Sequence, residues 1–228
     1  MHPSPLHYFP VTLLSMLLLV IAFAVVVALL EFGVLTYAYE KIGIGRRYIL
    51  AVLLLSLFGS AINIPIAELP AKDVVAQRLV NGGFGVWYVV PEIEHRGRTV
   101  LAVNLGGALI PLALSLYLLV KRGIYVEAAI GVAIMTAACH LMAKPVAGVG
   151  IAMPWLIPPV LAAIVALIIS RRQAAPLAYI SGSMGCLLGA DILNLSRIAD
   201  LGSPVASIGG AGVSDGIFLT GIIAVLLA

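Results

Sequence analysis

Long apolar segments recur along this chain and leave little room for a soluble core. Hydrophobic residues make up 62% of the sequence and charged residues 10%, whereas soluble domains carry about 25% charged residues. A helix needs about 20 predominantly apolar residues to cross a bilayer. The sequence therefore predicts an all-α integral membrane protein with a single transmembrane domain over residues 1–228. Its expected segments, some of them broken or re-entrant, are 11–39, 48–62, 105–120, 125–143, 155–170, 176–198 and 214–228.

Basic residues follow every second apolar segment. They are Lys41, Arg46 and Arg47 after the first, Lys121 and Arg122 after the third, and Arg171 and Arg172 after the fifth. Loops rich in Lys and Arg stay in the cytoplasm, so we expect seven crossings of the cell membrane, with the amino terminus outside and the carboxyl terminus inside. The net charge of +3 is too small and dispersed to indicate nucleic-acid binding. The lipid bilayer is the expected partner, and the pattern gives no oligomeric state.

One polar insert, residues 67–98, interrupts the apolar pattern on the predicted outer side. Its β-rich stretches 74–80 and 84–90 flank Asn81-Gly82-Gly83, a sequence typical of a β-hairpin turn. A second turn is expected at 95–97, with a further strand over 98–103. The sequence thus predicts a small extracytoplasmic β-hairpin element.

Polar residues from five segments share one expected depth. Counted from the cytoplasmic ends at a rise of about 1.5 Å per residue, all of them lie roughly 20 to 24 Å into the membrane. They are Asn63, Asn104, His140, Asp191 and Asp215. Ionisable groups inside a membrane are costly and commonly functional, so this layer is the candidate site.

Several neighbours extend the layer. Lys144 follows His140 at i,i+4 and Asn194 follows Asp191 at i,i+3, spacings that share a helix face. We expect Asn63 and Asn104 to cap broken helices or to satisfy freed backbone groups. Simpler interpretations stay open. Asp215 opens its helix and can be an N-cap, His140 can be a hydrogen-bonded interhelical residue, and Asp191 can pair with Lys144 or a protonated His140.

Two aspartates that meet can share a proton, so that one acts as acid and the other as base to activate water against a peptide bond. Residues 212–218, GVSDGIF, resemble the Gly-x-Gly-Asp-Phe-Ile-Phe signature of presenilin-type intramembrane aspartyl proteases. The resemblance implies that Asp215 and Asp191 are catalytic and that Gly212 and Ser214 belong to the motif, although Ser214 stands where that family has glycine. His140 and Lys144 would tune the protonation of the pair. The substrate would be a membrane-spanning peptide, held by strand addition to the insert.

The runs GADILNL and GGAGVSDGIFLTGI are also similar to an uncharacterised family of bacterial and archaeal multi-pass membrane proteins. That likeness implies a membrane location and no activity. We expect no cofactor.

Other functions stay open. Intramembrane Asp, His and Lys with broken helices suit a proton- or ion-coupled transporter or channel. His140, Asp191 and Asp215 could bind a divalent metal, although this is the weakest chemical interpretation. The polar layer could also only specify the packing of a non-catalytic subunit.

Small residues predict close packing of the sixth segment. Ser181, Gly185 and Gly189 recur every four residues and form a narrow helix face. The two cysteines of the chain, Cys139 and Cys186, both lie in apolar segments. We expect them to pack as small hydrophobic side chains.

Overall fold

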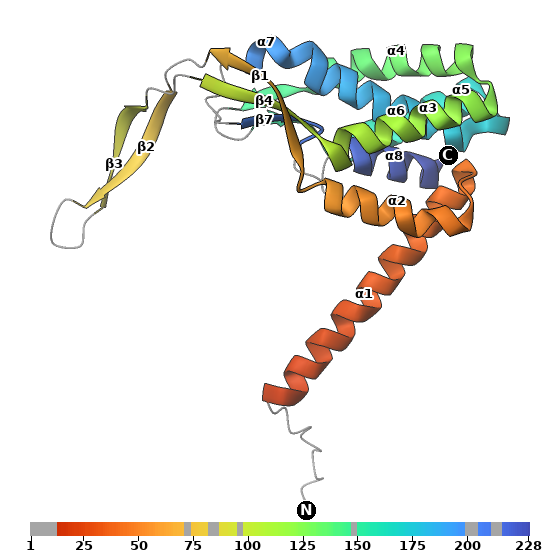
Figure 1. The fold of residues 1–228 in the computed structure, drawn as a ribbon, viewed down its shortest axis with the longest axis horizontal. Coiled ribbons are helices and arrows are strands. Elements are labelled where there is room, and N and C mark those ends of the chain that lie inside the picture. The colour runs from red at the N-terminus through yellow and green to blue at the C-terminus, as the bar shows by residue number, and fades with distance from the viewer. Residues whose placement is uncertain are drawn as a thin grey trace, which may run out of the picture. The chain divides into compact units, whose positions relative to one another are not determined.

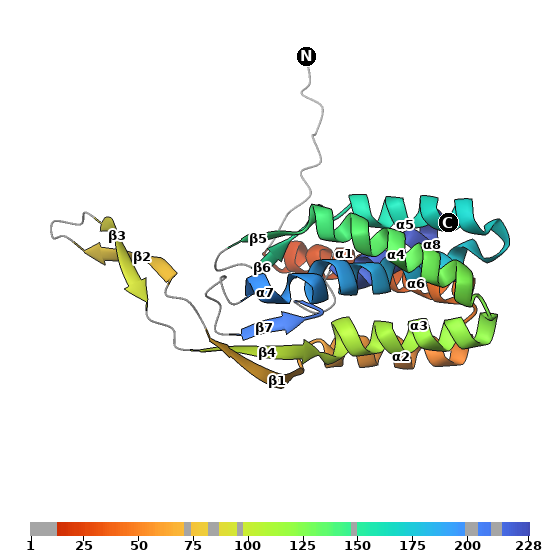
Figure 2. The same ribbon diagram turned by 90° about the horizontal axis from the view of Figure 1, so that it is seen from above.

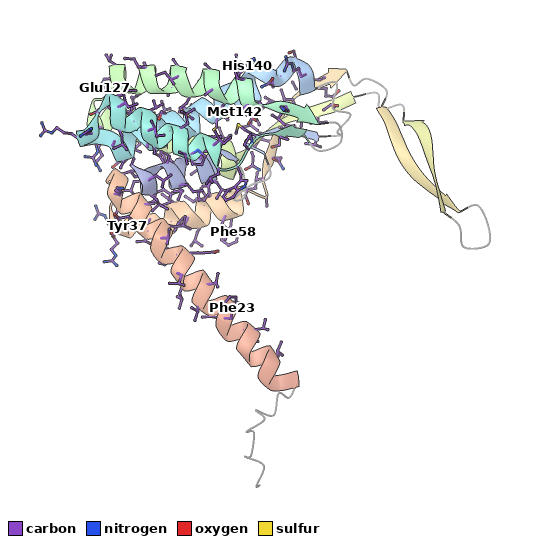
Figure 3. The ribbon with its side chains drawn as sticks, turned by 180° about the vertical axis from the view of Figure 1, so that it is seen from behind. Phe23, Tyr37, Phe58, Glu127, His140 and Met142 are labelled. Atoms are coloured by element: carbon purple, nitrogen blue, oxygen red, sulfur yellow. The ribbon has the colours of Figure 1, made fainter. Side chains whose placement is uncertain are left out.

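A computed structural model describes residues 13–70, 74–81, 87–94, 98–146, 150–198, 205–210 and 216–228. The chain forms two units, Met1–Tyr37 and Ala38–Ala228. Helix α1, Leu13–Ile42, supplies the described part of the first unit and enters the second. Its apolar side chains are widely exposed, as Phe23 illustrates (Figure 3). A helix that exposes apolar side chains over most of its length suits a lipid environment.

The second unit is a bundle of helices arranged around α6, which spans Ala174–Cys186. Almost every residue of α6 is buried, and the helix contacts α3, α4, α5 and α8 (Figures 1 and 2). The α-helices of the unit besides α6 are α2 (Arg46–Gly59), α3 (Ile110–Arg122), α4 (Tyr125–Met142), α5 (Ile157–Ile169), α7 (Leu195–Ile198) and α8 (Gly216–Leu227). Tighter 3₁₀ turns span Arg171–Gln173 and Ile192–Asn194, and wider π-helical turns span Leu105–Leu109 and Leu187–Asp191.

Among the residues that the structure describes, four helical stretches are long and apolar enough to cross a membrane, which indicates a membrane protein. They are Phe23–Ile42, Leu105–Arg122, Tyr125–Met142 and Arg171–Arg197. The helices α5 and α8 are apolar but shorter. Each apolar segment predicted from the sequence coincides with a helix, while the number of crossings stays a prediction.

Basic side chains hold one end of the bundle together. Lys121 Nζ donates a hydrogen bond to the Gly43 carbonyl oxygen at 2.7 Å, and Arg122 Nη2 donates to the Ile42 carbonyl oxygen at 2.9 Å. Lys41 Nζ approaches the Leu226 carbonyl oxygen of α8 at 3.5 Å. The last carbonyls of a helix lack partners within the helix, so these cations stabilise the ends of α1 and α8. We refer to this end as the basic end.

A three-stranded sheet forms at the opposite end of the bundle (Figures 1 and 2). Its strand order is β1 (Asn63–Pro70), β4 (Arg98–Asn104) and β7 (Val205–Ile208), with β1 antiparallel and β7 parallel to β4. Two further antiparallel hairpins pair β2 (Val74–Asn81) with β3 (Trp87–Glu94), and β5 (Lys144–Val146) with β6 (Gly150–Ala152). We refer to this end as the sheet end.

The predicted hairpin in the insert is confirmed by the pairing of β2 with β3. Its second strand is described from Trp87 onward, and residues 82–86 and 95–97, where the turns were expected, lie outside the described residues. The strand expected over 98–103 is confirmed as β4. Strand β1 was not predicted, because its Pro65 is typical of a break in a helix, yet proline is tolerated in an edge strand. The β5–β6 hairpin lies between the fourth and fifth predicted segments, 125–143 and 155–170.

Candidate functional site

Asp191 lies where the long helix that begins with α6 changes its winding. The π-helical turn Leu187–Asp191 is followed directly by the 3₁₀ turn Ile192–Asn194. Such π-turns occur mostly as local bulges and are frequent at functional sites. Asp191 Oδ2 accepts a hydrogen bond from the Gly209 N–H at 2.8 Å. The carboxylate therefore has a fixed orientation towards the turn that follows β7.

The turn that receives Asp191 depends on glycine. Gly209 and Gly210 have φ values of +87° and +57°, a left-handed conformation that glycine adopts without steric penalty. An added Cβ on Gly209 would lie 2.7 Å from the Ala108 nitrogen and 2.8 Å from the Gly107 carbonyl carbon. The Gly209 N–H can thus approach Asp191 because the residue has no side chain and tolerates positive φ.

Asn194 donates hydrogen bonds to backbone carbonyl oxygens where the helix changes from π-helical to 3₁₀ winding. Its Nδ2 donates to the Gly189 carbonyl oxygen at 3.0 Å and to the Ala190 carbonyl oxygen at 2.9 Å. The same nitrogen lies 3.3 Å from His140 Nδ1 on α4. Asn194 is fully buried, and its Oδ1 has no hydrogen-bond partner among the described residues. It therefore supports the backbone that carries Asp191 and links it to His140.

A second group of polar side chains joins the sheet to the helices. Asn63 Oδ1 accepts hydrogen bonds from Asn104 Nδ2 at 3.0 Å and from Ser207 Oγ at 2.6 Å. Asn104 Oδ1 accepts from the Gly107 N–H at 2.8 Å, so Asn104 caps its helix as predicted. Asn63 does not cap a helix; it opens β1, directly opposite Asn104.

The two groups meet along β7 and its turn. Ser207, which binds Asn63, lies two residues before Gly209, which binds Asp191. Five predicted residues are thus gathered at the sheet end, namely Asn63, Asn104, His140, Asp191 and Asn194. Figure 3 shows His140 and Glu127 towards opposite ends of α4.

The placement predicted for Lys144 on the His140 helix face is wrong. Helix α4 ends at Met142, and Lys144 begins strand β5, so the i,i+4 relation on one helix does not hold. Lys144 is exposed, and within the described part of the chain it forms no ion pair with Asp191. Asp215, Gly212 and Ser214 lie outside the described residues. No cluster of three metal-ligating residues occurs among the residues that are described.

A cavity of about 200 Å³ adjoins Asp191. Its polar side chains are Asp191 and Thr220, and its apolar wall includes Met153, Trp155 and Ile217. Gly216, which follows Asp215 in the chain, also lines it. Sequence reasoning missed Thr220 and Trp155. Thr220 had a usable signal, since it lies four residues after Gly216 and therefore on the same face of α8.

The Asn104 cap gives a prediction about stability. Asn104→Ala removes the cap of the turn at Leu105–Leu109 and both contacts of Asn104 Nδ2, with the Ser60 carbonyl oxygen and with Asn63. We expect the free energy of unfolding to fall by about 1–2 kcal/mol, measured by unfolding in mixed micelles. Ser60→Ala is the control, because the exposed Ser60 hydroxyl only bonds locally to the Leu57 carbonyl oxygen. Equal stability of the two variants would contradict the role of the cap.

The fold and the polar sheet end define a helical membrane protein with an acidic cavity. The chain belongs to the family described as a protein of unknown function, DUF1614, which matches residues 57–227. This confirms the expected membership of an uncharacterised family. No curated protein and no solved structure matches the chain.

Proposed function

We propose that this protein is an intramembrane aspartyl hydrolase in which Asp191 and Asp215 act as an acid–base pair. One observation carries the proposal: Asp191 lines a cavity that is also lined by Gly216, the residue next to Asp215 in the chain. The likeness of residues 212–218 to the presenilin-type signature is part of the proposal and concerns this short segment alone.

The chemistry needs two carboxyl groups in opposite protonation states. The ionised carboxylate removes a proton from a water molecule, which attacks the peptide carbonyl carbon, while the protonated carboxyl donates to the carbonyl oxygen. The hydrogen bond from the Gly209 N–H to Asp191 Oδ2 fixes the direction of this carboxyl group. In this proposal Asp191 and Asp215 share the acid and base roles.

The substrate in this proposal is a membrane-spanning peptide. The apolar part of the cavity wall, which includes Met153, Trp155 and Ile217, suits apolar side chains of such a segment. In this proposal an unwound peptide adds a strand to the three-stranded sheet, whose order is β1-β4-β7. β1 is less suited, because Pro65 and Pro70 cannot donate backbone hydrogen bonds.

The proposal includes seven crossings, with the amino terminus outside and the carboxyl terminus in the cytoplasm. Lys41, Lys121 and Arg122 meet at the basic end, which the positive-inside rule assigns to the cytoplasm. The Asp191 cavity lies towards the sheet end and would then open in the outer half of the membrane. Labelling of single cysteines from either side of sealed vesicles tests this orientation.

The decisive experiment reconstitutes the purified protein in lipid nanodiscs with a panel of single-span reporter peptides. We expect cleavage within the half of each reporter that lies nearest the outer surface, identified by the masses of both fragments. The same peptides presented without lipid serve as controls for a contaminating soluble protease. Intact reporters across the whole panel would overturn the hydrolase proposal.

A second candidate is a proton- or ion-coupled transporter. It is favoured by the position of Asp191 in a helix whose winding changes from π to 3₁₀, because interrupted helices with buried acids form ion sites in transporters. Proteoliposomes with a pH-sensitive dye inside would report flux driven by an imposed ion gradient. Flux without cleavage would favour this candidate, and the absence of both activities would favour a non-catalytic subunit.

A further inference from the structure

Two cysteines from different helices meet in the core of the bundle. Cys139 Sγ on α4 lies 3.2 Å from Cys186 Sγ at the end of α6, and both side chains are fully buried. A disulfide requires a sulfur–sulfur separation of about 2.05 Å. The two sulfur atoms therefore need to approach by only a little more than 1 Å to form a bond. Rotation of the two cysteine side chains can supply a movement of this size.

The backbones of the two helices lie close together around this pair. An added Cβ on Gly185 would overlap the Cβ of Met135, and an added Cβ on Gly189 would lie 2.9 Å from the Cβ of Cys139. These two glycines flank Cys186 on the helix that faces α4. They hold α4 and α6 in direct backbone contact, so closing the bond requires little movement of either helix.

We propose that Cys139 and Cys186 form a redox-active dithiol that is reversibly oxidised to a disulfide between α4 and the end of α6. Both thiols lose a hydrogen atom, and a lipid-soluble two-electron acceptor of the quinone class takes up both electrons and both protons to become the quinol. Burial within an apolar bundle disfavours the entry of ionic oxidants, so the acceptor in this proposal is lipid-soluble.

The pair is connected to the acidic cavity. Cys186 Sγ donates a hydrogen bond to Thr220 Oγ1 at 3.6 Å, and Thr220 lines the cavity beside Asp191. Oxidation removes the hydrogen that Cys186 donates, which leaves the Thr220 hydroxyl to turn towards the cavity. Asp191 lies five residues beyond Cys186 on the same helical stretch, so a bond at Cys186 also ties its helix to α4. The dithiol itself is independent of the hydrolase proposal.

The test uses the wild-type protein in nanodiscs, treated with a decyl-chain benzoquinone or left untreated, then unfolded in the presence of an alkylating agent. We expect the treated protein to lose two hydrogen atoms, to resist alkylation and to yield one cross-linked peptide containing Cys139 and Cys186. A reductant should restore two alkylatable thiols. Diamide, a small permeable dithiol oxidant, provides a second treatment that does not depend on quinone access.

Cys139→Ser and Cys186→Ser are the matched controls, and each should give no intramolecular cross-link. The proposal is overturned when both wild-type thiols remain alkylatable after both treatments, or when the only disulfides formed join two chains. The experiment measures a mass and not an activity. It therefore tests the dithiol even if the protein cleaves no peptide. In a protein that does cleave, the oxidised and reduced forms should differ in rate, and Thr220→Val should reduce that difference.

Discussion

Asp191→Asn should lower the rate of reporter cleavage by about a hundredfold or more, as expected for the loss of one member of a catalytic acid–base pair, while leaving the fold intact. The asparagine Oδ1 can still accept the hydrogen bond that the Gly209 N–H donates to Asp191 Oδ2. The Asp191→Asn substitution therefore removes the ionisable carboxyl group but preserves the hydrogen bond that positions the side chain. Asp215→Asn should lower the cleavage rate by a similar factor, because the acid–base pair needs both carboxyl groups.

Two further variants separate catalysis from structure. Asp191→Ala also removes the acceptor for the buried Gly209 N–H, so we expect it to lower the free energy of unfolding by about 1–3 kcal/mol, which Asp191→Asn should not do. Glu127→Gln is the matched control, since Glu127 lies in the first turn of α4, away from His140 (Figure 3). Cleavage by Asp191→Asn at the rate of Glu127→Gln would exclude Asp191 as a catalytic residue.

The helices could be predicted because their boundaries depend on residues that are neighbours in the sequence. Helix α4 was expected over 125–143 and spans Tyr125–Met142. Its end was predictable because Lys144-Pro145 ends an uninterrupted apolar run. The close approach of α6 to α4 was also predictable from Gly185 and Gly189, which now lie against Met135 and Cys139. Apolar length and small-residue spacing each depend on a few neighbouring residues, so one sequence suffices to recognise them.

The sheet could not be predicted in full because its pairing is not local. Strand β7 pairs with β4 about a hundred residues earlier in the chain, and Val205–Ile208 lies in a Gly/Ser-rich segment typical of a loop. Strand β1 was hidden by Pro65, which an edge strand tolerates. Nothing near either segment specifies its partner.

The depth of the site was predictable, but its contacts were not. Counting helical rise placed Asn104, His140 and Asp191 at one level, and the structure gathers them at the sheet end. Gly209, which binds Asp191, and Ser207, which binds Asn63, belong to the missed strand and its turn. The helical spacing failed for Lys144 because α4 ends before it.

Gly189→Ala should lower the free energy of unfolding by about 3 kcal/mol, at the upper end for overpacking of a core. Gly189 lies in the π-helical turn that carries Asp191, with its backbone against α4. An added Cβ would overlap the Thr136 carbonyl oxygen and lie 3.0 Å from the His140 nitrogen. Backbone atoms cannot rotate away as a flexible side chain can, so α4 and the π-helical turn must separate.

The separation should also weaken the site, because the Gly189 carbonyl and His140 both contact Asn194. We therefore expect Gly189→Ala to lose stability in mixed-micelle unfolding and to lose cleavage activity together. Gly33→Ala on α1 is the control, since its added Cβ meets nothing within 4 Å and alanine favours a helix over glycine by up to about 1 kcal/mol. If Gly189→Ala unfolds at the same denaturant concentration as Gly33→Ala, the backbone contact between α4 and the π-helical turn does not hold Asp191 in place.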